Sequence, residues 1–472
     1  MKKRLLSIIL ILSMMMCLVP ITAFAEGETA TGTAAIQFGT DAISVLSKNA
    51  NSANAPTVYF GQNHENNPAA WRVIGYDGSG VASTQGDMAL LAAYNMGWTM
   101  FGESNAYADS DLKEAVDTLA GKLTAEETDA VEKRTLATGS YNGENTDCVA
   151  GPAVSNAVFW PLSSKEACAV NDNLRIVDPE HMGWLSSFWL LRSPSASDSD
   201  VTYVEGDGVV KFNYSVYGIY QELGVRPAFN LNLDSVLFTS AAVGGKPDGG
   251  LQPVSQNYTG NEWKLTVKDS SRSDFRVTTK ELYAYSKGDT IDISYTTAKT
   301  GANEYISALI LDDVGNITYY GRSNAPLTEK DGTAQLTVPA GFAEGTYTLK
   351  VFNEQYNGDY KTDLSSNFTD ITLTVGKNVK EQFTLTPGGR YYFDLSAMNI
   401  PGTVNSKLPD STLHYVPFTY AGTVDAYVLN TASVGVADSS EQASVTKDKT
   451  AQYGYTYEHS LFIVDDKVTT NI

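Results

Sequence analysis

The feature that most constrains the fold is an alternation of apolar and polar residues within residues 258–376. It occurs at 263–267, 291–295, 336–338, 347–351 and 371–375. Alternation places every second side chain on one face of a strand, as in a half-buried β-sheet. Gly- and Asp-containing turns separate these runs at near-regular spacing. The second module, residues 258–376, is therefore predicted to be an all-β sandwich.

The first module, residues 53–238, has strand-like sequences at both ends and helical ones between. The strand-like runs lie at 58–61, 71–75, 88–94, 188–191, 201–204, 209–212 and 224–231. Gly206 and Gly208 in the turn at 205–208 predict a hairpin. Strands on either side of helices predict an α+β domain whose two ends pair in one sheet.

Three helix starts are expected inside the first module. Asp111, followed by Glu114, precedes an apolar face and a stop at Gly121. Thr124 begins a capping box for a helix reaching Val131, and Ser163 begins another before Ala167 and Cys168. These capping positions account for the acidic residues Asp111, Glu114, Glu126 and Glu127, so we do not expect a glycosidase acid/base pair here.

The remaining segments are read from composition. Residues 26–52 are rich in Thr, Ala, Ser and Asn and predict a flexible leader, while Gly and Pro at 239–257 predict a linker. Residues 377–472 contain strand-like runs at 383–385, 391–393, 415–420, 426–429 and 461–464. We expect this last part to be a β-rich module. It is either complete or cut off, because the chain stops shortly after its last strand-like run.

The amino terminus has the features of an export signal. Three basic residues (Lys2, Lys3 and Arg4) precede an apolar run at 5–19 that is too short for an ordinary membrane span, and residues 23–25 read Ala-Phe-Ala. We expect a signal peptide over 1–25 and a mature chain from Glu26; the alternative is an uncleaved anchor. Cys17 is not preceded by a lipobox. The protein is therefore predicted to be secreted or held at the cell surface.

Charge excludes one class of partner. The signal contains three of the 33 basic residues and none of the 54 acidic ones, so the mature chain carries a net charge of −24. Such a charge repels the phosphates of nucleic acids and keeps an exported protein soluble. Binding to DNA or RNA is therefore not expected, and no further long apolar run predicts a membrane span.

Cysteine and histidine are scarce. Cys148 and Cys168 remain after signal cleavage, and they form either one disulfide or two half-buried thiols. The four histidines at positions 64, 181, 414 and 459 show no metal-ligand spacing, so no metal site is expected. A G-x-S-x-G nucleophile motif is also absent from the sequence, and neither cysteine has an evident histidine partner.

Three separated blocks carry a family resemblance. Residues 188–194 read FWLLRSP, residues 201–208 read VTYVEGDG and residues 224–231 read GVRPAFNL. Together with Trp71 they resemble an uncharacterised domain with a W-L-R-S-P … V-R-P-A signature, found in secreted proteins of Firmicutes. The resemblance covers about residues 53–238 and departs at Phe229, where that family more often has Leu. It implies a Gram-positive source.

The signature is in turn similar to the end of C-type-lectin-like bacterial domains, a group that includes formylglycine-generating enzymes and many adhesins. This implies a C-type-lectin-like first module with a binding role. The second module resembles immunoglobulin-like spacers, and residues 345–347 (Gly-Thr-Tyr) are similar to a tyrosine corner. The signature residues Trp71, Trp189, Arg192 and Arg226 are expected to hold the fold; the alternative is ligand contact.

Two loops are candidate binding sites. Asp198 and Asp200, in a Ser-rich loop, could bind Ca²⁺ through hard oxygens, although the E-P-N and W-N-D motifs of lectin calcium sites are absent from it. Tyr214, Tyr217 and Tyr220 could stack on a sugar or peptide. The alternatives are a solvated loop and ordinary loop tyrosines.

These observations predict an adhesin-like binding protein for an extracellular glycan or protein, without catalytic activity and without a required cofactor. The first alternative is a structural stalk of the cell envelope. The second is an oxidase related to the formylglycine-generating enzymes, which need two close cysteines to hold copper. Cys148 and Cys168, twenty residues apart, do not match that motif.

Overall fold

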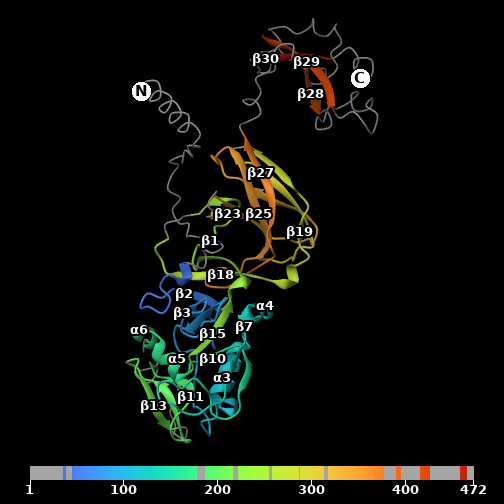
Figure 1. Cartoon of the computed structure of the whole chain (residues 1–472). Coiled ribbons are helices and arrows are strands. Elements are labelled where there is room, and N and C mark those ends of the chain that lie inside the picture. Colours follow the sequence, from blue (N-terminus) through green and yellow to red (C-terminus); the bar gives the residue numbers. More distant parts are fainter. Residues whose placement is uncertain are drawn as a thin grey trace, which may run out of the picture. The chain divides into compact units, whose positions relative to one another are not determined.

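The computed structural model describes residues 36–38, 45–177, 187–215, 222–254, 258–285, 288–312, 317–376, 390–394, 415–425 and 458–464 (Figure 1). The expected signal peptide lies outside these residues. The chain divides into two compact units, residues 1–376 and 377–472. Within the described residues, no helix combines the length and the apolar character that a membrane crossing requires.

One sheet joins the two ends of the first module. Strand β3 (Pro68–Tyr76) is antiparallel to β2 (Thr57–Gln62) on one side and to β5 (Asp87–Ala92) on the other. Strand β5 pairs in turn with β15 (Pro227–Asn232), near the end of the module. The expected pairing of the module's two ends is confirmed. All residues of β5 and all but the last of β15 are buried, including Asp87 and Asn230, so these two strands lie inside the first module.

A second, smaller sheet carries the W-L-R-S-P block and the hairpin that follows it, while most of the V-R-P-A block lies at and in β15 of the larger sheet. The smaller sheet is built from β11 (Trp189–Pro194), β12 (Asp200–Val204) and β13 (Val210–Ser215), together with the short strands β14 (Leu223–Gly224) and β6 (Trp98–Thr99). Strands β12 and β13 form the predicted antiparallel hairpin. Its turn places Gly208 at φ +84°, in the left-handed region that glycine adopts without a steric cost.

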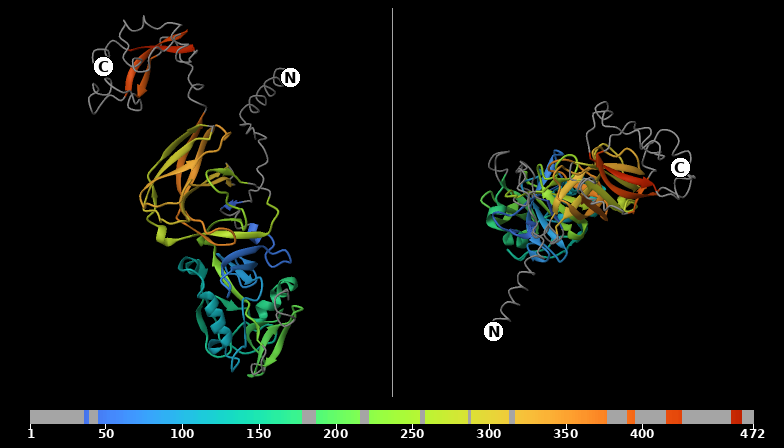
Figure 2. Two further views of the ribbon diagram at one scale, coloured as in Figure 1. Left: turned by 180° about the vertical axis from the view of Figure 1, so that it is seen from behind. Right: turned by 90° about the horizontal axis from the view of Figure 1, so that it is seen from above.

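The helices are short and begin at capped positions. They are α3 (Asp111–Ala120), α4 (Ala125–Asp129), α5 (Ser164–Ala169) and α6 (Asp172–Arg175). Both predicted capping boxes, at Thr124 and Ser163, are present. The N-cap of α3 is Ser110 and not Asp111, and α4 ends two residues before Val131, which enters a strand. Figures 1 and 2 show α3, α5 and α6 at the end of the first module that is remote from β18.

Strand β18 (Glu262–Lys268) joins the two modules into one sheet. It is antiparallel to β16 (Val236–Ala241) and parallel to β2 and to β26 (Asp363–Ser365). This corrects the expectation of a linker over 239–257. The Gly- and Pro-rich segment begins inside β16 and is held by packing, with Lys246 only 3 % exposed.

The leader is also partly structured. Strand β1 (Ile36–Phe38) pairs antiparallel with β16, and Leu46 is buried in the core of the first module. The expectation of a flexible leader over 26–52 is therefore corrected for these residues. A three-residue strand shows no periodicity in the sequence, because it is too short for the alternation to be recognised.

The second module has two sheets around one core. The first sheet contains β20 (Glu281–Tyr285), β27 (Thr369–Gly376), β25 (Gly345–Gln355), β22 (Glu304–Leu311) and β23 (Ile317–Arg322). The second contains β19 (Arg276–Val277), β21 (Thr290–Thr296) and β24 (Gly332–Thr337). Ile293, Leu336 and Leu349 are among the apolar residues of both sheets that form the shared core. The predicted all-β character is confirmed, with mixed and antiparallel pairing.

Residues 377–472 contain a three-stranded antiparallel sheet of β28 (Arg390–Asp394), β29 (Tyr415–Asp425) and β30 (Glu458–Val464). The predicted β-rich character is confirmed for these strands. The expected strands at 383–385 and 426–429 lie outside the described residues.

Candidate ligand-binding cleft

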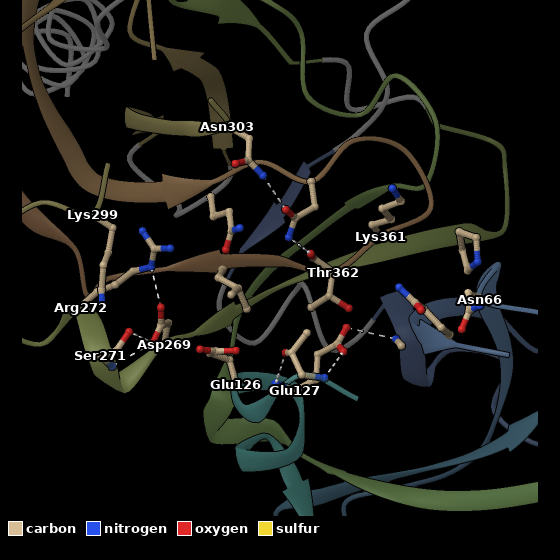
Figure 3. A pocket seen from close by; sticks show the side chains of 17 residues that line it. Asn66, Glu126, Glu127, Asp269, Ser271, Arg272, Lys299, Asn303, Lys361 and Thr362 are labelled. Atoms are coloured by element: carbon tan, nitrogen blue, oxygen red, sulfur yellow. Dashed lines mark hydrogen bonds and ion pairs between the residues drawn. The ribbon is translucent and has the colours of Figure 1, made fainter. Parts of the chain in front are cut away.

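A cleft of about 620 Å³ lies where the two modules meet (Figure 3). Its walls come from the β2–β3 loop and α4 of the first module, and from segments next to β18, β22, β25 and β26 of the second. The residues that line it are Gly61, Gln62, Asn66, Pro68, Thr124, Glu126, Glu127, Asp269, Ser271, Arg272, Lys299, Asn303, Gln355, Asn357, Lys361, Thr362 and Leu364. None of these is aromatic, and most are polar.

The wall from the first module is fixed by the capping box of α4. Glu127 accepts a hydrogen bond from Thr124 N–H at 3.0 Å and one from Gly61 N–H at 3.2 Å. The second bond ties the loop after β2 to the helix. Gly61 has φ +65°, in the left-handed region that glycine adopts without a steric cost, so the backbone conformation there favours glycine. Glu126, one residue before, is half-buried at the cleft.

The floor is a buried ionic network around Arg272. Its Nε donates to Asp269 Oδ2 at 2.7 Å, and its terminal nitrogens donate to Glu304 Oε2 and Oε1 at 2.6 and 2.8 Å. Asn353 Oδ1 accepts a further bond from Arg272 at 2.9 Å and one from Lys299 N–H at 2.9 Å. Burial alone would lower the pKa of Arg272, but the bonds to Glu304 outweigh it and raise that pKa. The floor is therefore rigid and charged.

The wall from the second module is formed by asparagine side chains and by the threonine Thr362. Asn303 Nδ2 donates to Asn357 Oδ1 at 2.8 Å, and Asn357 Nδ2 donates to the carbonyl of Thr362 at 2.7 Å. Thr362 is only 4 % exposed, and its hydroxyl has no hydrogen-bond partner among the described residues. A buried hydroxyl without a partner costs free energy. At the wall of a polar cleft, this group is suited to bond a ligand.

The rim offers charged and neutral donors. Lys299, Lys361 and Gln62 are exposed, and Asn66 Oδ1 accepts from Lys122 Nζ at 2.7 Å. The cleft can therefore form hydrogen bonds to both donors and acceptors of a ligand, with a fixed floor beneath them. Within the described residues, no cluster of three or more His, Cys, Asp or Glu could hold a metal ion.

The signature residues lie in the core of the first module, away from the cleft lining. Trp71 is fully buried, donates from Nε1 to the carbonyl of Phe60 at 2.7 Å and packs against Phe229 at a centroid distance of 4.6 Å. Trp189 Nε1 donates to the carbonyl of Arg175 at 3.1 Å. These contacts favour a structural role for both tryptophans.

Arg226 is buried and donates hydrogen bonds to backbone carbonyls. It donates to the carbonyls of Ala92, Leu174 and Arg175, and its guanidinium lies 5.0 Å from the ring centroid of Trp189. Burial, with a smaller contribution from Arg72, lowers the pKa of Arg226 to about 9. Its contacts tie β5, α6 and the closing strand together.

Arg192 belongs to an ionic cluster under the signature strand. It donates to Glu166 Oε2 at 2.5 Å, to Asp147 Oδ1 at 2.8 Å and to the carbonyl of Pro161 at 2.9 Å. Arg134 reaches the other oxygen of Glu166 at 2.6 Å. Burial by itself would raise the pKa of Glu166, but Arg192 and Arg134 outweigh it and hold that pKa at about 2.

This cluster predicts acid sensitivity. The folded-state pKa of Glu166 is about 2, and its ordinary value is 4.5. The contribution of ionised Glu166 to the free energy of unfolding is therefore complete above pH 4.5 and is lost as the pH falls through 2. The difference corresponds to about 3 kcal/mol. In urea unfolding, Glu166→Gln should therefore be less stable than wild type at pH 7, and the gap should close toward pH 2. A gap that does not change with pH would contradict this assignment.

The predicted loop residues are only partly within the described chain. Tyr217 and Tyr220 lie outside it, and Tyr214 pairs with Val201 in the β12–β13 ladder. Asp198 is exposed and Asp200 is half-buried. The loop at 197–199 is closed by a bond between the hydroxyls of Ser197 and Ser199 at 2.8 Å. The aromatic site and the calcium site both stay predictions.

Both cysteines are free, half-buried thiols. Cys148 Sγ donates to the carbonyl of Ser140 at 3.4 Å. Burial raises the pKa of both thiols, so the thiolate that attacks substrates or binds metals is less populated than in an ordinary cysteine. The disulfide between them stays a prediction.

Sequence reasoning did not find the cleft. Glu126 and Glu127 were noticed, but as helix-capping residues, and the residues that face them are more than 140 positions away along the chain. No pattern within either segment indicates that they meet. Only the pairing of β18 with β2 and with β26 brings the two walls together.

Comparison with known proteins identifies one domain. Residues 92–233 match a family described as a domain of unknown function (DUF6273). The matched range contains the predicted W-L-R-S-P and V-R-P-A blocks but begins after Trp71. No curated protein matches the chain.

Proposed function

We propose that this is a secreted or cell-surface binding protein that holds a segment of an extracellular glycan in the cleft between its two modules, without catalysis. The observation that carries the proposal is the buried hydroxyl of Thr362 in the wall of a polar cleft, which has no hydrogen-bond partner in the described part of the chain. The signal-like amino terminus supports an extracellular site of action.

The polarity of the cleft supports a polar ligand. Small-molecule pockets are mostly apolar with a few polar groups, whereas the lining here is mainly carboxamide, hydroxyl and charged side chains. Removing these groups from water is unfavourable unless the ligand replaces the lost hydrogen bonds. A ligand with dense donors and acceptors is therefore favoured.

Carboxamides support a glycan in particular. Gln62, Asn66, Asn303, Gln355 and Asn357 all border the cleft, and each amide offers both donors and an acceptor. Sugar hydroxyls have the same dual character. Without an aromatic ring in the described lining, binding would rest on hydrogen bonds. As part of this proposal, the first module has a C-type-lectin-like fold and the second module has an immunoglobulin-like fold.

Non-catalytic action is supported by the state of the titratable groups. Glu127 and Asp269 are engaged in hydrogen bonds that fix the backbone and Arg272. Burial raises the pKa of both cysteines, which disfavours the oxidase alternative.

A structural stalk is the second candidate, favoured by one observation. Strand β18 hydrogen-bonds to strands of both modules, so the sheet runs from one into the other without a flexible connection. Such continuity suits a rigid spacer. In that case the cleft would be a water-filled joint with no ligand.

The test is a binding screen of purified residues 26–472 against host mucin glycans, bacterial wall polysaccharides and peptides, with and without a chelator. We expect saturable glycan binding that Lys361→Ala weakens and Lys330→Ala leaves unchanged, because Lys361 lines the cleft and Lys330 is exposed elsewhere. If the protein binds only peptides, the proposed ligand would be a protein and not a glycan. No binding to any member would leave the stalk as the better proposal.

Thr362→Val separates binding from folding. The substitution keeps the shape of the side chain and removes the buried hydroxyl, so the free energy of unfolding should stay the same or rise by about 1 kcal/mol. The affinity for the glycan found in the screen should fall about tenfold, the equivalent of one lost hydrogen bond. Titration calorimetry and urea unfolding measure the two effects. Unchanged affinity would show that Thr362 does not contact the ligand.

A further inference from the structure

A second buried feature lies at the same junction but is not part of the cleft's chemistry. Lys246, Lys264, Glu354 and Asp363 form what we call the junction cluster, and each is at most 3 % exposed. Lys246 Nζ lies 2.5 Å from Glu354 Oε1, 2.6 Å from Asp363 Oδ2 and 2.6 Å from Thr266 Oγ1. All three donors of its ammonium are therefore used.

Two aromatic rings also lie close to the ammonium group of Lys246. Its Nζ lies 4.6 Å from the ring centroid of Phe238 and 5.7 Å from that of Tyr320. Ions in such a place lose their hydration, and a buried pair regains that loss only in part. A neutral amine beside a neutral carboxyl is then much closer in free energy to the ion pair than it would be in water.

The carboxylate of Asp363 has hydrogen-bond donors at both of its oxygens. Its Oδ1 accepts from Asn357 N–H at 2.8 Å, and its Oδ2 lies 2.8 Å from Lys264 Nζ as well as near Lys246. Donors aimed at both oxygens stabilise the charge that develops when a nucleophile adds to the carboxyl carbon. Glu354 contacts the same amine through Oε1, and its Oε2 accepts hydrogen bonds from the hydroxyls of Ser307 at 2.5 Å and Tyr320 at 2.6 Å.

We propose that Lys246 and Asp363 form an intramolecular amide bond that ties the segment between the two modules to the second module. The Lys246 ammonium passes one proton to Asp363 Oδ2, and the resulting amine attacks the Asp363 carboxyl carbon. Glu354 takes a second proton from the nitrogen and delivers it to Oδ2, which leaves as water. The nitrogen keeps its third hydrogen. The charges balance, because one positive and one negative group are consumed together and Lys264 and Glu354 remain as a pair.

The bond would join the segment between the modules to a strand of the second module. Lys246 follows β16, which pairs with β1 and β18, and Asp363 lies in β26, which pairs with β25 and β18. The two residues are 117 positions apart. Closing so long a loop restricts the unfolded chain, as a disulfide does, without depending on redox conditions. This inference is independent of the ligand proposed for the cleft.

Mass spectrometry of purified residues 26–472 tests the bond. Loss of one water should make the intact protein about 18 Da lighter than its sequence requires. After trypsin, residues 212–264 and 362–377 should appear as one branched peptide whose fragments place the link on Lys246 and Asp363. A full sequence mass with two separate peptides would overturn the proposal, and so would a link to Glu354.

Matched variants test the roles of the neighbours. Glu354→Gln should show its full sequence mass and a melting temperature lower by on the order of 10 °C. Lys264→Arg keeps the cation beside Asp363 and should retain the 18 Da loss, about that of one water. A bond that forms equally in Glu354→Gln would overturn the assignment of Glu354. Because the mass of the wild-type protein decides the main point, a variant that fails to fold does not prevent a conclusion.

Discussion

Replacing Arg192 with methionine should lower the free energy of unfolding of the first unit by about 3–5 kcal/mol, the usual cost of removing one partner from a buried ion pair. Arg192 is 1 % exposed and is bonded to Glu166, which is 6 % exposed. Methionine fills a similar volume, so the loss would come from the charge left behind and not from a large cavity.

Urea unfolding followed by circular dichroism measures this effect. Lys133→Met is the matched control, because it removes a basic side chain from the same module at an exposed position. We expect the control to change stability by less than about 0.5 kcal/mol. Equal effects in the two variants would mean that the cluster under the signature strand does not stabilise the fold.

Replacing Arg272 with methionine should also lower the free energy of unfolding of the first unit by about 3–5 kcal/mol. It would leave Glu304 and Asp269, each 6 % exposed, without the cation that bonds them both. Since Arg272 forms the floor of the cleft, glycan binding should be lost in the fraction of protein that stays folded.

A double variant provides a second measurement for Arg272→Met. Glu304→Gln in the Arg272→Met background removes one of the two buried carboxylates left behind, so the double variant should regain part of the lost unfolding free energy. Arg276→Met is the control: Arg276 is exposed and donates to the carbonyls of Ser273 and Phe275. A double variant that is no more stable than Arg272→Met would show that buried carboxylate charge does not cause the loss of stability.

Local chemistry predicted the elements of the first module well. Both capping boxes, at Thr124 and Ser163, occur where the sequence placed them, because a cap depends only on residues three positions apart. The β12–β13 hairpin follows from its Gly208 turn for the same reason. The start of α3 was misplaced by one residue, since Ser110 and Asp111 are both good caps and only the backbone decides between them.

Local sequence patterns did not predict which polar and charged residues are buried. Lys246 lies in a Gly- and Pro-rich stretch that reads as a solvated linker, yet it is buried against Glu354 and Asp363, more than a hundred residues away. Thr362 likewise shows nothing unusual in the sequence. Its significance comes from burial without a partner, which is a property of the folded chain.

By itself, the sequence determined a first module with strands at both ends and helices between, a β-rich second module, the capped helices and the match of residues 92–233 to DUF6273, because periodicity, caps and turns act over a few residues. Only the tertiary structure decided that the modules share one sheet through β18, that the cleft forms between them, and that the charged residues of the junction cluster are buried together. These features depend on contacts between distant segments, and hydrogen bonding along strand edges carries no residue-specific pattern from which such partners could be read.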